Sequence, residues 1–108
     1  MLADEHVVSP SNLQQQTINA ARERQQKIQT VRGFFNSKPA LKALRSAKID
    51  SKKVQDAIAQ LSDAELARLA ARTNAAQKDF AGGALSNQDL TYIIIALATA
   101  VVVIILVK

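Results

Sequence analysis

LTYIIIALATAVVVIILV, the stretch from Leu90 to Val107, decides the architecture of this chain. Its 18 residues contain no charge, no Pro and no Gly. A helix of this length extends about 27 Å, close to the ~30 Å hydrocarbon core of a bilayer. Eleven of the residues are β-branched and favour strands in water, but no turn residue divides the run and no other strand exists to pair with it. Since only a helix satisfies all backbone groups of one segment in lipid, the stretch predicts a single transmembrane helix.

The residues at the ends of this stretch fit a helix that crosses a membrane. Ser86 is placed to cap its first turn, and Asp89 suits the positive end of the helix dipole. Lys108 can extend to the head groups at the far end. Ala96 and Ala100 form a small-xxx-small pair through which two such helices can approach. Self-association is therefore one expected partnership, beside a separate protein partner and the membrane itself.

The rest of the chain predicts an all-α fold with a long N-terminal helix, a small bundle of three short helices and the C-terminal transmembrane helix. Residues 1–9 are expected to form a flexible tail, 10–81 a helical domain, 82–86 a Gly hinge and 87–108 the anchor. The first domain boundary follows from Ser9, which can cap a helix that has Pro at its first position.

Start and stop signals divide the helical domain. A thin apolar stripe runs to Phe35, where Asn36-Ser37-Lys38-Pro39 ends the first helix because the residue before Pro avoids the helical region. Asp50 is expected to cap a third helix. Ser62 and Glu65 form a capping box that opens a fourth helix, and Gly82-Gly83 ends it. The predicted core of the three-helix bundle consists of Leu41, Leu44, Ile49, Val54, Ile58, Leu61, Leu66 and Leu69.

Positive charge is concentrated in one block of the chain. Between Arg22 and Lys53 there are ten basic residues and only two acidic ones, Glu23 and Asp50, so this block has a net charge of +8. The net charge of the whole protein is +5. The simplest interpretation is a solvated helical surface, while the alternatives are contacts with anionic lipid or nucleic acid. The ten residues are Arg22, Arg24, Lys27, Arg32, Lys38, Lys42, Arg45, Lys48, Lys52 and Lys53.

Nothing in the sequence favours catalysis, and we predict that the protein is not an enzyme and carries no cofactor or metal. His6 is the only His and there is no Cys, so neither a metal site nor thiolate chemistry can be built. The capping box accounts for Asp63 and Glu65. The third and fourth helices could imitate a helix-turn-helix, but the fourth carries few basic residues and a membrane anchor limits access to DNA, so nucleic acid is disfavoured.

The segment KIDSKKVQDAIAQLSDAELARLAAR (Lys48–Arg72), followed by Gly82-Gly83 and a terminal apolar helix, resembles a bacterial family of small single-pass membrane proteins of unknown function. The matching elements are Ile49-Asp50, Val54, the Leu61-Ser62-Asp63 turn, Glu65-Leu66, the Gly pair and the anchor. The opening Asp4–Pro10 is similar to the mature start of some members. The resemblance implies a preceding signal peptide, and Leu2-Ala3 before Asp4 reads as its remnant.

The expected location is the inner (plasma) membrane with an extracytoplasmic helical domain, and the alternative is a tail-anchored protein with that domain in the cytosol. We predict a non-catalytic scaffold or partner-binding component of a bacterial envelope or membrane complex. A basic-surface binder of anionic lipid or nucleic acid is the alternative. A holin-like membrane peptide is a weaker one, because the anchor lacks the polar stripe of a pore.

Overall fold

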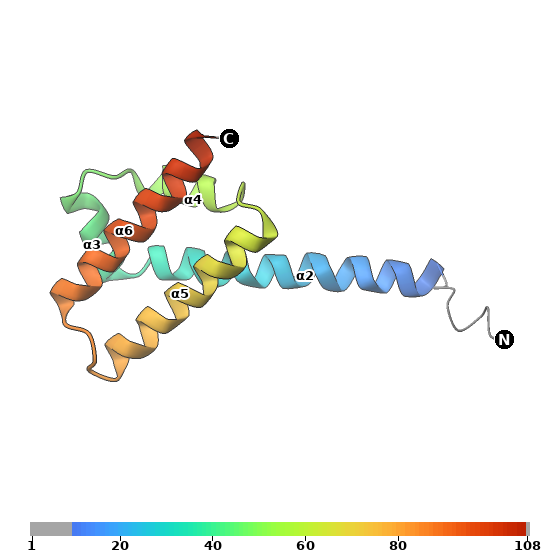
Figure 1. The fold of residues 1–108 in the computed structure, drawn as a ribbon, viewed down its shortest axis with the longest axis horizontal. Coiled ribbons are helices and arrows are strands. Elements are labelled where there is room, and N and C mark those ends of the chain that lie inside the picture. The colour runs from blue at the N-terminus through green and yellow to red at the C-terminus, as the bar shows by residue number, and fades with distance from the viewer. Residues whose placement is uncertain (1–9, 108) are drawn as a thin grey trace.

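The fold is given by a computed structural model that describes residues 10–107. The predicted flexible tail, its cap Ser9 and the terminal Lys108 lie outside the described residues. Within them the all-α prediction is confirmed, since the chain forms five helices and no strand (Figure 1). In chain order these are α2 (Pro10–Phe35), α3 (Lys38–Ser46), α4 (Ser51–Ile58), α5 (Asp63–Ala81) and α6 (Asn87–Leu106).

The helices begin where side chains can replace missing backbone partners. Ser37 caps α3 by accepting a hydrogen bond from Ala40 N (3.3 Å), and its hydroxyl donates to the Phe34 carbonyl at the end of α2 (2.7 Å). Asp50 caps α4 by accepting from Lys52 N (2.9 Å). One short polar side chain therefore both closes α2 and opens α3, which keeps the turn between them to two residues.

The ends of α3 and α5 share one backbone pattern. After α3, Lys48 takes a positive φ of 60°, and Ile49 N donates to the Leu44 carbonyl at 2.9 Å. After α5, Gly83 has φ 82°, and Ala84 N donates to the Asp79 carbonyl at 2.8 Å. Both are Schellman motifs, in which a left-handed residue lets the chain satisfy the last helical carbonyls and leave the helix axis.

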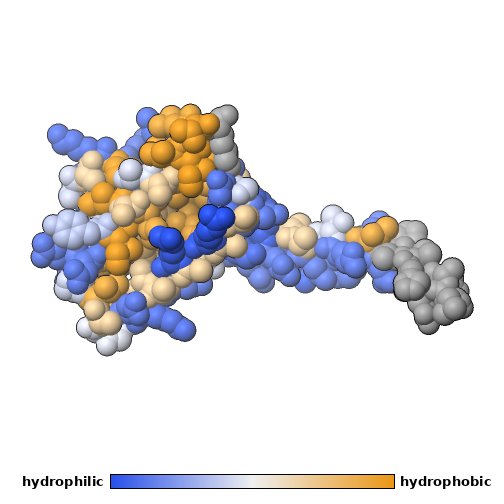
Figure 2. Space-filling view, viewed as in Figure 1, coloured by the Kyte–Doolittle hydropathy of each residue, from blue (hydrophilic) through white to orange (hydrophobic). Residues whose placement is uncertain are grey.

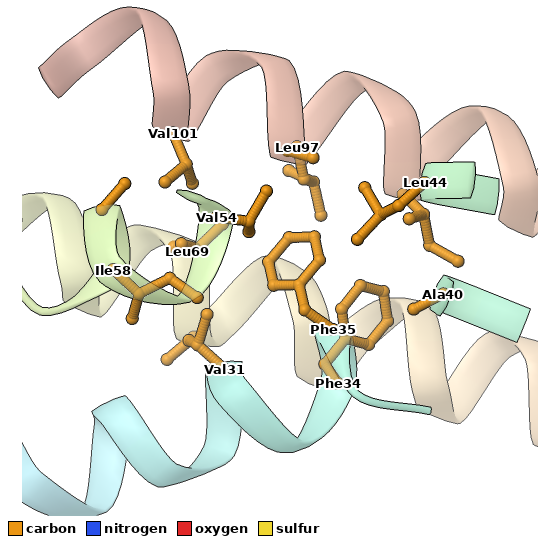
Figure 3. Packing of buried hydrophobic residues seen from close by; sticks show 14 of the residues in the cluster. Val31, Phe34, Phe35, Ala40, Leu44, Val54, Ile58, Leu69, Leu97 and Val101 are labelled. Carbon is orange, nitrogen blue, oxygen red and sulfur yellow. The ribbon is translucent and has the colours of Figure 1, made fainter. Parts of the chain in front are cut away.

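The helices α2 and α6 lie on opposite sides of a shared core, and α3, α4 and α5 lie between them and contact both (Figure 3). The sequence led us to expect a bundle of three helices beside a separate anchor. In the structure α6 packs along that bundle, and its inner face belongs to the same hydrophobic cluster as α2–α5. The fourth helix also differs from expectation, because α5 has 19 residues rather than being short.

Most of the predicted bundle core is buried, but Leu41 and Ile49 are only half-buried. The centre of the cluster instead includes the end of α2. Phe35 is fully buried, and its ring meets that of Phe34 edge to face with centroids 5.2 Å apart. Figure 3 shows Phe35 pointing from α2 towards Leu97 of α6. The two aromatic rings thus fill the space between the outer layers.

The N-terminal half of α2 projects away from the other helices (Figure 1). It gives the molecule extents of 62 × 33 × 18 Å. The predicted apolar stripe on this helix is buried only from Ile28 onward, while Leu13, Thr17 and Ala21 are exposed. We call residues 12–23 of α2 the arm; all of them are exposed.

Candidate functional site

The helix α6 is long and apolar enough to cross a membrane, and no other helix among the described residues is. It spans Asn87–Leu106 with a mean hydropathy of 2.5. Only 28% of its most apolar window is buried inside the protein. The core helix of a water-soluble protein is instead expected to be mostly buried, so the low buried share favours contact with another apolar phase.

The inner face of α6 is what joins the helix to the bundle. Leu90, Ile94, Leu97, Ala98 and Val101 are buried and recur at the spacing of one helix face. Each of the four larger side chains contributes about 1.5–3 kcal/mol by leaving water. This docking is therefore a substantial part of the cohesion of the fold.

The outer face of α6 leaves large apolar side chains in solvent. Tyr92 is 63% exposed, Val103 is 48% exposed, and Leu106 and Val107 are each 78% exposed. Figure 2 shows hydrophobic surface gathered at the C-terminal end of α6. Contiguous exposed apolar surface of this kind marks a membrane or protein contact. The predicted small pair, Ala96 and Ala100, is exposed as well.

The start of α6 is fixed by its own side chains. Ser86 Oγ accepts from Asp89 N (3.1 Å), and Asp89 Oδ2 accepts from Ser86 N (3.4 Å), which completes a capping box. The hydroxyls of Thr91 and Thr99 donate hydrogen bonds to the carbonyls four residues earlier, those of Asn87 and Ile95. Within an apolar environment these hydroxyls are thus satisfied by the helix itself.

Arg24, one of the predicted anionic-surface residues, is turned towards the protein. Its guanidinium donates to Asp63 Oδ1 (2.8 Å) and to the carbonyls of Ala59 (3.1 Å) and Leu61 (2.9 Å). The Arg24 side chain is 32% exposed and that of Asp63 is 84% exposed, so solvent weakens the ion pair. The three contacts nevertheless tie α2 to the turn between α4 and α5, where Arg24 supplies a donor to the C-cap carbonyl of α4 and to the carbonyl of Leu61 in the turn.

The Arg32 side chain also points into the protein, against α4, and not towards solvent. Its Nη2 donates to the Gln55 carbonyl on α4, and Gln55 Nε2 donates back to the Arg32 carbonyl, both at 3.4 Å. The Arg32 Nε is buried and has no hydrogen-bond partner among the described residues. This residue joins α2 to α4 and contributes little to an outward positive surface.

The other eight basic residues remain available at the surface. Lys27 is half-buried, whereas the rest are exposed: Arg22, Lys38, Lys42, Arg45, Lys48, Lys52 and Lys53. Lys38 and Lys42 on α3 line a groove of about 440 Å³ with Asn87 and Thr91 at the beginning of α6. Positive charge therefore adjoins the polar beginning of the apolar helix.

The predicted capping residues have local structural roles. Ser62 N donates to Glu65 Oε1 (2.9 Å) and Glu65 N donates to Ser62 Oγ (3.2 Å), so the box opens α5. Among residues 10–107 there is no cluster of three His, Cys, Asp or Glu side chains that could hold a metal ion. The inward role of Arg24 was not predicted, and its only signal in the sequence is a charged residue at an expected apolar turn of α2.

Comparison of the chain with protein-family models, with curated protein sequences and with solved structures finds no match. The resemblance to a bacterial membrane-protein family therefore stays a prediction.

Proposed function

We propose that this protein is a non-catalytic, membrane-anchored helical scaffold that binds a protein partner, with α6 as its membrane segment. The uncovered apolar face of α6 carries the proposal. Val103 and Leu106 stand in solvent on a helix without charge after Asp89, and a bilayer covers such a face completely. The composition of α6 thus suits lipid better than water.

The arm of α2 is the best candidate for the partner-binding element. It extends beyond the other helices, carries no charge before Arg22 and presents Leu13 and Ile18, which are 51% and 50% exposed. Both side chains border one shallow groove with Thr17. A projecting helix with a few apolar anchors is suited to lie against a groove or another helix.

Co-purification in mild detergent tests the scaffold proposal. The full chain is expected to retain a defined partner that the double variant Leu13→Asp/Ile18→Asp loses. The matched control is Gln16→Asp/Asn19→Asp, since these two exposed residues carry the same charges on the opposite side of the same arm, about 200° around the helix from the midpoint between Leu13 and Ile18. Equal recovery of the partner by both double variants would argue against the arm, and recovery of no defined partner by the full chain would argue against a scaffold.

A basic-surface binder is the second candidate, favoured by the position of Lys38 and Lys42 beside the start of α6. Binding through these residues is electrostatic and therefore weakens as salt screens it. Partner retention that does not change with salt supports the scaffold, whereas loss of binding at high salt together with a requirement for anionic lipid or nucleic acid supports the second candidate.

We further propose, from the resemblance noted in the sequence, that the helical domain lies outside the cytoplasm of a bacterial cell. Protease added to intact spheroplasts then cleaves the domain. Protection until the spheroplasts are lysed supports the tail-anchored alternative with a cytosolic domain.

A further inference from the structure

The apolar helix α6 has charged neighbours in the bundle. Grooves along its C-terminal half are lined by residues of α4 and α5 together with residues such as Val101, Val102 and Ile104. The charged side chains in these grooves are Lys53, Asp56, Glu65, Arg68 and Arg72. If a bilayer surrounded α6 in this docked position, these charges would enter the hydrocarbon, where ionised side chains are strongly disfavoured.

We propose that α6 occupies two exclusive positions, docked on α3–α5 in water and inserted alone in a lipid bilayer. This inference rests on the proposed membrane function and adds how the segment is carried before it reaches lipid. Docking hides Leu90, Ile94 and Leu97 from water, while insertion covers the outer face that docking leaves bare. The bilayer is the occupant that completes the cover, because α6 carries no charge between Asp89 and the end of the helix.

The connection between α5 and α6 suits such a change. The Schellman motif around Gly83 closes α5 with hydrogen bonds from Gly83 and Ala84 back to α5 itself. The Ser86–Asp89 box opens α6 with bonds inside α6. Neither helix end depends on the contacts between α6 and the bundle. Leu85 N also donates to the Asp79 carbonyl at 3.2 Å, so rotation about the bonds between Leu85 and Ser86 can move α6 as an intact helix, as in a hinge.

Tethering tests the exchange. The chain contains no Cys, so Ser46→Cys/Thr91→Cys places two unique thiols in residues that line one groove between α3 and α6. A short bismaleimide joins them in the docked position. The control is the same double variant treated with a monofunctional maleimide, which carries the same adducts without a tether. Both samples are mixed with preformed vesicles and washed with carbonate.

The exchange predicts that the tethered protein is retained on the washed vesicles at least tenfold less than the control. Equal retention of both overturns the exchange but leaves membrane anchoring in place. Retention of neither overturns the membrane function and the exchange with it. Failure of the tether to form in water contradicts the docked position, and a second pair of exposed positions, Gln60→Cys/Leu106→Cys in the groove between α4 and α6, checks that result independently.

Discussion

The two longest helices, α2 and α6, each leave a large surface uncovered, but the chemistry of that surface is opposite. The arm of α2 is mainly Gln, Asn, Ala and Thr, and its backbone is hydrogen-bonded within the helix, so water is an adequate surrounding. The outer face of α6 carries Tyr92, Val103 and Leu106, which water does not solvate well. An exposed polar helix is well solvated by water, whereas an exposed apolar helix is more stable in contact with lipid or with another apolar surface.

The largest effect is expected when the aromatic ring that joins α2 to the core is removed. Phe35 is fully buried, so Phe35→Ala is expected to lower the free energy of unfolding by about 3–5 kcal/mol. The matched change in the arm, Leu13→Ala, is expected to cost less than about 0.5 kcal/mol because Leu13 is half in solvent. Chemical denaturation of both variants measures the difference. Similar losses for both would mean that the arm is packed against the body.

A smaller loss of stability is expected when the hydrogen bonds between Arg24 of α2 and the turn between α4 and α5 are removed. Arg24→Ala removes the contacts to Asp63 and to the Ala59 and Leu61 carbonyls, and is expected to cost about 1–2 kcal/mol. Arg22→Ala is the control, since it removes the same charge from an exposed position on the same helix. If the two variants have the same melting temperature, the contacts of Arg24 with the turn between α4 and α5 do not stabilise the fold.

The smallest predicted effect is a gain in stability. Lys48 occupies a left-handed position, at φ 60°, that a side chain with a Cβ rarely adopts. Lys48→Gly is therefore expected to raise the free energy of unfolding by about 0.5–1 kcal/mol, net of the extra freedom of Gly in the unfolded chain. A lower melting temperature would place the turn after α3 in a different conformation.

Local signals allowed much of the fold to be predicted. The caps at Asp50 and Ser62 and the stop at Gly82 are set by residues within four positions of one another, so the sequence alone carries them. The left-handed Lys48 could not be predicted, because the Schellman position is usually Gly. The inward role of Arg24 was equally hidden, since its partners lie 35–39 residues away.

The docking of α6 on the bundle could not be predicted from composition. Its charge-free composition predicts a helix of membrane length, and the structure contains that helix. Composition says nothing about docking, because the same Leu, Ile and Val side chains satisfy a protein core and a bilayer alike. Burial of Ile94 and Leu97 against α2–α5 depends on shape, which only the folded bundle provides.

A single charge at the middle of α6 tests whether this helix spans a membrane. Thr99 is exposed, so Thr99→Asp is expected to leave the melting curve of the docked protein nearly unchanged. In a bilayer an Asp at the centre of a helix costs about 2.5–3.5 kcal/mol, which reduces partition into membranes by roughly 10²-fold. Thr99→Val is the matched control with the same shape and no charge.

The measurement is the fraction of each protein that stays with membranes after a carbonate wash. We expect the natural chain and Thr99→Val to be retained and Thr99→Asp to be released in folded form. Equal retention of all three, or release of the natural chain itself, would contradict the assignment of α6 as a membrane-spanning helix.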